Sequence, residues 1–184
     1  ILFEKGKKNG LKFLKILNKD QIKEYEPYVN GLKAIHVPQA GITDYKLVCK
    51  KIYQILKNRK VEFLFNSKVV NIINSSVSNT VIIDSSKEIV SNYVINVAGL
   101  YSDKLANFNF KTDYKIIPFR GEYYNLKPSA YHMVKNLIYP VPNPDFPFLG
   151  VHFTRRIDNS IESGPNAVFA FSREGYKIST INLK

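Results

Sequence analysis

The feature that most constrains the fold is a nearly continuous apolar run, Tyr93–Val97, which ends in the small residues Ala98 and Gly99. Such a run is typical of a strand buried on both faces of a parallel sheet. Small residues at its end let a ligand approach the backbone closely. Nucleotides bind at the carboxyl ends of parallel strands, so the pattern predicts a binding site here. A tight strand-to-helix turn, with Ser102 as the helix cap, explains the same residues without a ligand.

The segment before this run has helix-like and strand-like patterns. The clearest helix ends near Asn58, and Thr43 or Asp44 can cap its start. Its apolar residues recur at the spacing of a buried helix face: Val48, Ile52, Ile55 and Leu56. A shorter helix is predicted after Asp20, which can cap it. Strands are predicted at 32–37, 61–65, 68–73, 80–84 and 87–90, and the last three read as a meander.

From about residue 115 the pattern becomes strand-like and rich in Pro and Gly. Five of the nine Pro residues fall between Pro128 and Pro147. Proline lacks the backbone N–H that a helix interior or a central strand needs, so 140–147 is predicted to be an ordered loop or a linker. The stretches 148–154 and 160–163 read as the arms of a hairpin. The change predicts an α/β region followed by antiparallel β, with a domain crossing near residue 115.

Length and composition bound the class of protein. A chain of 184 residues, 45% of them hydrophobic, can bury an ordinary globular core. The single cysteine, Cys49, excludes an internal disulfide, and the three His lack ligand spacing, so we expect no metal site. No apolar run approaches the roughly 18 residues that span a bilayer. We therefore expect a cytoplasmic or matrix-side location, and the start at Ile1 rather than Met suggests a piece of a longer protein.

The net charge of +12 raises the alternative of a basic nucleic-acid-binding module. Only five of the 27 basic residues are Arg, and the Lys residues are scattered rather than clustered on one segment. We therefore expect no nucleic-acid partner. Binding that weakens steeply with salt would distinguish this alternative.

Polar side chains in the second half could bind or deprotonate a small molecule. Arg120 has the planar, forked guanidinium that suits a carboxylate, or it pairs with Glu122 at the surface. Tyr123 and Tyr124 alternate on a strand, so at most one of them faces a site. His152 and Thr154 lie two apart and share a face. A neutral His can accept a hydroxyl proton, although a structural His bonded to a backbone carbonyl fits equally well.

Four ordered blocks carry a family resemblance: Val94–Asp103, Pro118–Tyr124, Tyr139–Thr154 and Glu162–Ala167. In this order and spacing they resemble the middle of the L-2-hydroxyglutarate oxidase/dehydrogenase family. That family belongs to the FAD-dependent oxidoreductases of the D-amino-acid-oxidase type. The similarity runs from about Phe3 to about Tyr176.

The resemblance implies a partial FAD-binding Rossmann-like domain with an interleaved, mostly antiparallel substrate-binding sheet. Residues 44–115 would belong to the FAD domain, and 1–43 and 116–184 to the substrate domain. The family's Gly-x-Gly-x-x-Gly fingerprint would precede Ile1, so we expect this chain alone to bind FAD poorly and to expose apolar surface.

The resemblance also implies roles for individual residues. Ala98 and Gly99 would line the FAD, and Gly164 would lie where the chain returns toward the flavin. Val69 or Val70 would bond the adenine through its backbone, although an ordinary buried strand residue is equally consistent with either.

The implied reaction converts L-2-hydroxyglutarate to 2-oxoglutarate by hydride transfer to the flavin. His152 would act as base or orienting donor, with Thr154 beside it. Arg120 and one of Tyr123 and Tyr124 would hold the carboxylates of this dicarboxylate substrate. The electron acceptor would be oxygen or a quinone, and any membrane association would be peripheral. The alternatives are a related FAD oxidoreductase acting on glycine, sarcosine or glycerol 3-phosphate, and an inactive fragment.

Overall fold

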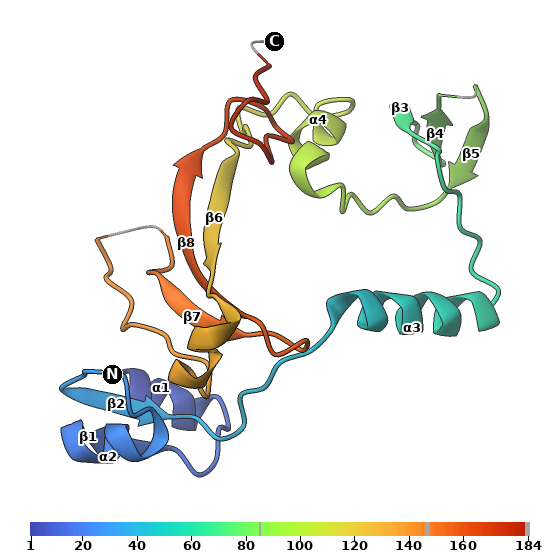
Figure 1. Ribbon diagram of the computed structural model, residues 1–184. Helices are drawn as coiled ribbons and strands as arrows, with labels where there is room; N and C mark the ends of the chain where they lie inside the picture. The colour runs from blue at the N-terminus through green and yellow to red at the C-terminus, as the bar shows by residue number, and fades with distance from the viewer. Residues whose placement is uncertain (85, 146–147, 183–184) are drawn as a thin grey trace. The chain divides into compact units, whose positions relative to one another are not determined.

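The computed structural model describes residues 1–84, 86–145 and 148–182 (Figure 1). By its internal contacts the chain divides into two compact units. The first unit comprises Ile1–Gln54 and Gly121–Ala167. The second comprises Ile55–Arg120 and Val168–Lys184. Each unit is therefore built from two separate stretches of chain.

The N-terminal part of the first unit is a small αβαβ arrangement. Its elements are α1 (Leu2–Lys8), β1 (Lys15–Asn18), α2 (Lys19–Tyr25) and β2 (Lys33–His36). The two strands pair antiparallel, and Leu17 and Ile22 are buried. The cap of α2 is Asn18, not the predicted Asp20. Asn18 forms a reciprocal capping box with Gln21, which satisfies two helix-end N–H groups at once.

The predicted main helix is present as α3 (Tyr45–Asn58). Asp44 caps it, because its Oδ1 accepts hydrogen bonds from the N–H groups of Lys46 and Leu47. The prediction that its apolar face is buried is wrong for this chain, since Val48, Ile52 and Ile55 are all exposed. The adjacent Cys49 is exposed too. Helix formation follows from local sequence, whereas burial needs a neighbour that the described residues do not provide.

The second unit contains the predicted meander. Its strands are β3 (Val69–Asn74), β4 (Asn79–Ile83) and β5 (Glu88–Ser91), paired antiparallel in chain order. Ile72 and Ile83 are its buried residues. The turn between β3 and β4 is held by Ser75, whose Oγ accepts from the N–H of Ser78.

Two strand predictions in this unit are wrong. Residues 61–65 and 93–97 have no regular secondary structure. Tyr93, Ile95 and Val97 are each more than 80% exposed. A strand forms only where another strand supplies hydrogen-bond partners, and none of the described strands lies beside 93–97.

After this stretch come the 3-10 helix η1 (Gly99–Tyr101) and the short helix α4 (Ser102–Ala106). Ser102 is not the cap that was predicted. Its Oγ donates to the carbonyl of Gly99 instead, so the side chain closes the turn rather than the helix end.

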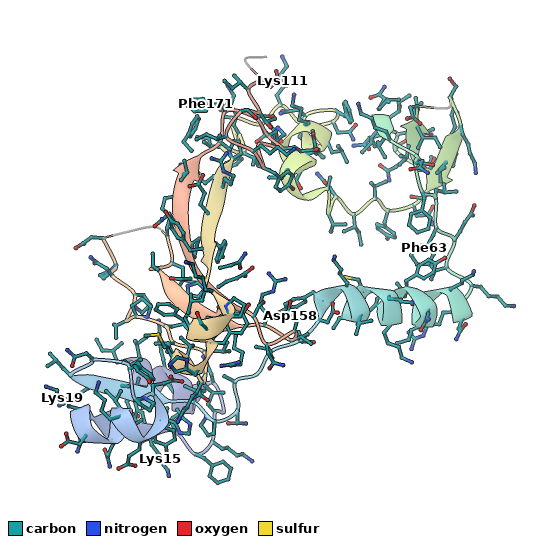
Figure 2. The ribbon with its side chains drawn as sticks, viewed as in Figure 1. Lys15, Lys19, Phe63, Lys111, Asp158 and Phe171 are labelled. Atoms are coloured by element: carbon teal, nitrogen blue, oxygen red, sulfur yellow. The ribbon has the colours of Figure 1, made fainter. Side chains whose placement is uncertain are left out.

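The remaining sheet has three strands in the order β6-β8-β7: β6 (Phe119–Asn125), β7 (His152–Arg155) and β8 (Ile161–Phe169). The predicted hairpin is confirmed, with β7 and β8 antiparallel. Asp158, labelled in Figure 2, lies in its turn, where the N–H and hydroxyl of Ser160 bond to the carboxylate and lower the pKa of Asp158. Ile161 at the start of β8 is fully buried.

The 3-10 helix η2 (Pro128–Met133) follows β6. Residues 140–145 of the Pro-rich block have no helix and no strand, as predicted, and 146–147 lie outside the described residues. The predicted class, α/β with antiparallel β, is confirmed. Across the described ranges, no helix is long and apolar enough to cross a membrane.

Candidate functional site

In the first unit, His152 begins β7 and is buried, with 7% of its surface exposed. Its imidazole stacks on the ring of Tyr139, with 4.4 Å between centroids and 22° between planes. Its Nδ1 lies 3.0 Å from the carbonyl oxygen of Gly150. The ring is therefore held both by stacking and by a hydrogen bond.

The bond to Gly150 defines the tautomer of His152. A carbonyl oxygen only accepts, so Nδ1 must carry the proton. In the neutral ring this leaves Nε2 as the acceptor nitrogen. The arrangement matches the backbone-bonded His that the sequence allowed, and it also leaves the lone pair that a proton acceptor needs.

Three further residues predicted for the site lie in the same sheet. Thr154 shares a face of β7 with His152, and Gly164 on β8 is paired in register with His152. Tyr123 on β6 covers Gly164. A Cβ at Gly164 would lie 2.6 Å from Cδ1 of Tyr123 and 2.8 Å from the carbonyl oxygen of Glu122. Only glycine fits there. The sheet thus brings together His152, Thr154, Gly164 and Tyr123, whereas Tyr124 is largely exposed.

Two side chains organise the loop next to β7. Arg155 donates to the carbonyls of Tyr131 and Val134, so it anchors η2. The buried carboxylate of Glu26 accepts hydrogen bonds from the N–H groups of Lys135 and Asn136. Both interactions join segments distant in sequence, and no local pattern predicts them.

Arg120 belongs to the second unit. Its Nη1 donates to the carbonyl oxygen of Gly175 at 3.0 Å. Its predicted role in carboxylate binding and its predicted pairing with Glu122 both remain predictions. The bond to Gly175 positions the guanidinium beside the segment that follows β8.

The second unit contains a cavity of about 760 Å³. Val69, Val70 and Ala98, three of the residues predicted to contact a cofactor, line it together. The other lining residues are Lys68, Tyr101, Lys104, Leu105, Phe108 and Glu174. The walls are mainly apolar, with charged groups from Lys68, Lys104 and Glu174.

Gly99 directly follows Ala98, which lines this cavity. The φ of Gly99 is +55°, a backbone conformation that residues other than glycine rarely adopt. No atom lies within 4 Å of the position that a Cβ of Gly99 would take. Glycine is therefore required by the backbone, and space is left open beside it.

These residues fit part of a dinucleotide cofactor. A mainly apolar cavity beside exposed backbone suits a flat aromatic ring and its sugar. The phosphates would need a glycine-rich turn at a helix N-terminus, and the sequence contains no Gly-x-Gly-x-x-Gly. Within the described residues, no group of three or more His, Cys, Asp or Glu could hold a metal ion.

A polar cluster missed by the sequence analysis lies beside the cavity. Asp103 on α4 forms a two-pronged ion pair with Arg173, with N–O distances of 2.6 and 2.9 Å. The hydrogen bonds from Arg173 lower the pKa of Asp103 to about 2. The hydroxyl of Tyr101 donates to Glu174 at 2.7 Å, which raises the pKa of Tyr101.

A family model and the sequences of known proteins place this chain in the same family. The family described as "FAD dependent oxidoreductase" (DAO) matches residues 1–181. The chain is 50% identical to an L-2-hydroxyglutarate dehydrogenase of Indibacter alkaliphilus over 99% of its length. It is 44% identical to a mitochondrial L-2-hydroxyglutarate dehydrogenase of Homo sapiens over 96% of its length. These matches cover only 46% and 41% of the two relatives, so the chain spans less than half of each.

Solved structures share the fold at low sequence identity. A glycine oxidase from Bacillus cereus matches 99% of this chain and 47% of its own, with a TM-score of 0.68 and 15% identity. An L-proline dehydrogenase from P. horikoshii matches 90% of this chain and 44% of its own, with a TM-score of 0.73 and 16% identity. These similarities establish the architecture and leave the substrate open.

Proposed function

Because this chain belongs to the FAD-dependent oxidoreductase family, we propose that it forms part of an enzyme that oxidises L-2-hydroxyglutarate to 2-oxoglutarate. The observation that carries the proposal is identity of 50% and 44% to L-2-hydroxyglutarate dehydrogenases across nearly the whole chain. The first-unit sheet supports it with a histidine whose Nε2 is an acceptor.

The reaction breaks two bonds of the substrate. The hydroxyl loses its proton and C2 loses a hydride, which leaves a carbonyl at C2. Nε2 of His152 would take the proton, since the Gly150 carbonyl already holds the proton of Nδ1 in place. Thr154, on the same face of β7, would orient the hydroxyl. FAD, when bound, supplies the two-electron acceptor for the hydride.

A dicarboxylate needs groups that hold its two ends. Arg120 would bind one carboxylate through its forked guanidinium. Tyr123 would donate a hydrogen bond from its hydroxyl to a carboxylate. The ring of Tyr123 lies over Gly164, which limits how the ring can turn. Tyr124 is the other candidate, from the opposite face of the strand.

The cofactor contacts would come from small residues and backbone. Val69, Val70 and Ala98 line the cavity of the second unit, and Gly99 leaves open space beside it. Gly164 is a further proposed contact. On this proposal, residues 44–115 belong to the FAD domain, and residues 1–43 and 116–184 belong to the substrate domain.

The proposed electron acceptor is oxygen or a membrane quinone. Several relatives carry the word mitochondrial in their names. A location in the cytoplasm or on the matrix side of a membrane, with peripheral association, fits electron delivery to a quinone.

The proposal is tested by product formation in the longest natural form of the polypeptide that contains this chain. The purified protein is given L-2-hydroxyglutarate and an artificial electron acceptor, and both reduction of the acceptor, which any oxidised substrate causes, and formation of 2-oxoglutarate are measured. The D enantiomer, glycine, sarcosine and glycerol 3-phosphate serve as comparison substrates. We expect product from the L enantiomer at least about a hundredfold faster than from the D enantiomer, because misplacing the reacting atoms is costly. Preference for glycine, sarcosine or glycerol 3-phosphate would contradict the substrate assignment.

A further inference from the structure

The Asp103–Arg173 ion pair of the second unit is reinforced by further hydrogen bonds. Arg173 binds both carboxylate oxygens of Asp103 and also donates to the carbonyl of Leu100. The N–H groups of Lys104 and Ile116 donate to the same carboxylate, at 2.8 and 3.1 Å. Only 8% of the Asp103 side chain and 21% of the Arg173 side chain is exposed.

This pair joins the two segments that build one wall of the cavity. Tyr101 and Lys104, on either side of Asp103, line the cavity, and so does Glu174, which follows Arg173. The guanidinium of Arg173 lies 5.7 Å from the centroid of the Tyr101 ring, and Tyr101 bonds to Glu174. The η1 turn and the segment after β8 are therefore tied together at several points.

The same residues border a second cavity. This cavity of about 590 Å³ is lined by Tyr101, Lys104 and Glu174 as well, so these side chains border open space in two cavities. Phe171, labelled in Figure 2, lines that second cavity and packs edge-to-face on Phe169. Residues that border two cavities have fewer packing neighbours than residues of a filled core, so hydrogen bonds contribute more to holding their position.

We propose that Arg173 and Asp103 are positioning residues for the cofactor site, holding the η1 turn after Ala98 in the place that cofactor binding requires. The inference rests on the proposed binding of FAD at the cavity lined by Val69, Val70 and Ala98. Neither Arg173 nor Asp103 is among that cavity's lining residues, so both act through their neighbours.

The geometry explains why arginine is needed. Two parallel N–H groups match the two carboxylate oxygens, and a further N–H reaches Leu100. Lysine keeps the charge but offers a single ammonium centre that cannot make the paired bonds. Glutamine loses the charge as well and leaves Asp103 partly buried without its ion pair.

The test measures FAD affinity in the longest natural form of the polypeptide, stripped of flavin and then titrated with FAD while quenching of FAD fluorescence is followed. The variants are Arg173→Lys, Arg173→Gln and Asp103→Asn. The matched controls are Arg156→Lys and Arg156→Gln, which alter the exposed Arg156–Glu162 pair of the first unit. Thermal unfolding and the visible circular dichroism of bound flavin are recorded for every variant.

We expect FAD affinity to fall about tenfold for Arg173→Lys and further for Arg173→Gln and Asp103→Asn, since truncating a partly buried charge pair is costly. The flavin dichroism should change in the same order, while the Arg156 variants stay within about twofold of wild type, because exposed pairs contribute little. Lower melting temperatures with unchanged FAD affinity and dichroism would overturn the inference and reduce the pair to a structural role.

The result is separable from the substrate assignment. Graded loss of FAD affinity in a protein that ignores L-2-hydroxyglutarate would support the positioning role and contradict only the proposed substrate. Normal FAD affinity in Arg173 variants that still oxidise L-2-hydroxyglutarate would support the proposed substrate and contradict the positioning role. A wild-type protein that binds no FAD would overturn both.

Discussion

The two units present different chemistry. The first unit gathers polar side chains on a sheet, where His152, Thr154 and Tyr123 lie around Gly164. The second unit offers a cavity lined mainly by apolar side chains and bounded by backbone, with Val69, Val70 and Ala98 in its wall. The difference indicates that side-chain identity encodes the proposed substrate chemistry, whereas small residues and backbone conformation encode the proposed cofactor site. Substitutions in these two sets of residues should therefore have separable effects.

The largest expected effect is on turnover, from a change in the first unit. In His152→Asn the amide N–H can replace the bond to the Gly150 carbonyl, but no nitrogen remains to accept a proton. We expect flavin reduction by substrate to slow by about 10²- to 10⁴-fold, the usual worth of a positioned base, with flavin content unchanged. Stopped-flow absorbance measures both quantities.

The control for this variant is His132→Asn on η2, whose ring contacts Tyr28 and is not proposed for the site. It should reduce flavin at the wild-type rate. Loss of flavin from His152→Asn would contradict the separation of the two roles, because a side chain assigned to the substrate would then be needed for cofactor binding.

The second expected effect is on flavin binding, from a change in the second unit. Gly99→Val forces a β-branched residue into a φ of +55°. The strain should displace the η1 turn and weaken FAD affinity about tenfold, since the left-handed conformation costs about 1–2 kcal/mol. The rate of reduction per bound flavin should stay within about twofold of wild type.

Gly41→Val is the matched control, because Gly41 has no positive φ and no atom lies within 4 Å of the position of its Cβ. Equal loss of FAD affinity in both variants would remove the special role of the Gly99 conformation.

The third expected effect is on stability within the first-unit sheet. In Gly164→Ala the new methyl group would overlap the ring of Tyr123 and the carbonyl of Glu122. We expect about 1–3 kcal/mol of destabilisation, the usual cost of overpacking, measured by urea denaturation. The double variant Gly164→Ala with Tyr123→Ala should recover part of that loss by removing the ring. No recovery would show that the backbone overlap dominates.

The smallest expected effect is a pH dependence from the second unit. Arg173 lowers the pKa of Asp103 from 3.8 to about 2 in the folded protein. A lowered carboxyl pKa contributes stability above the unfolded value, and this contribution is lost as the pH falls from about 4 to about 2. The melting temperature of the wild type should therefore fall more steeply over this interval than that of Asp103→Asn. Parallel curves would contradict the role of the pair.

Local signals predicted much of this structure. The cap at Asp44, the meander of β3 to β5 and the hairpin of β7 and β8 follow from capping residues, periodicity and turn chemistry within short windows. Predictions that needed a neighbour were wrong. The strand expected at 93–97 has no pairing partner among the described strands, and the apolar face of α3 is exposed.

The site was predictable to the same degree. His152 and Thr154 were placed on one face by strand periodicity. Val69, Val70 and Ala98 line one cavity, and their contact with a cofactor remains a prediction. Asp103 and Arg173 lie 70 residues apart in the chain, and no local pattern indicates that they pair. Long-range ion pairs of this kind depend on the tertiary fold and become visible only in the structure.

The most direct test of the account follows the flavin absorbance of the longest natural form of the protein while L-2-hydroxyglutarate is added without oxygen. The account predicts that the flavin band bleaches in the wild type and persists in His152→Asn over the same interval. Bound flavin that stays oxidised in the wild type would contradict the proposed substrate and the role of His152.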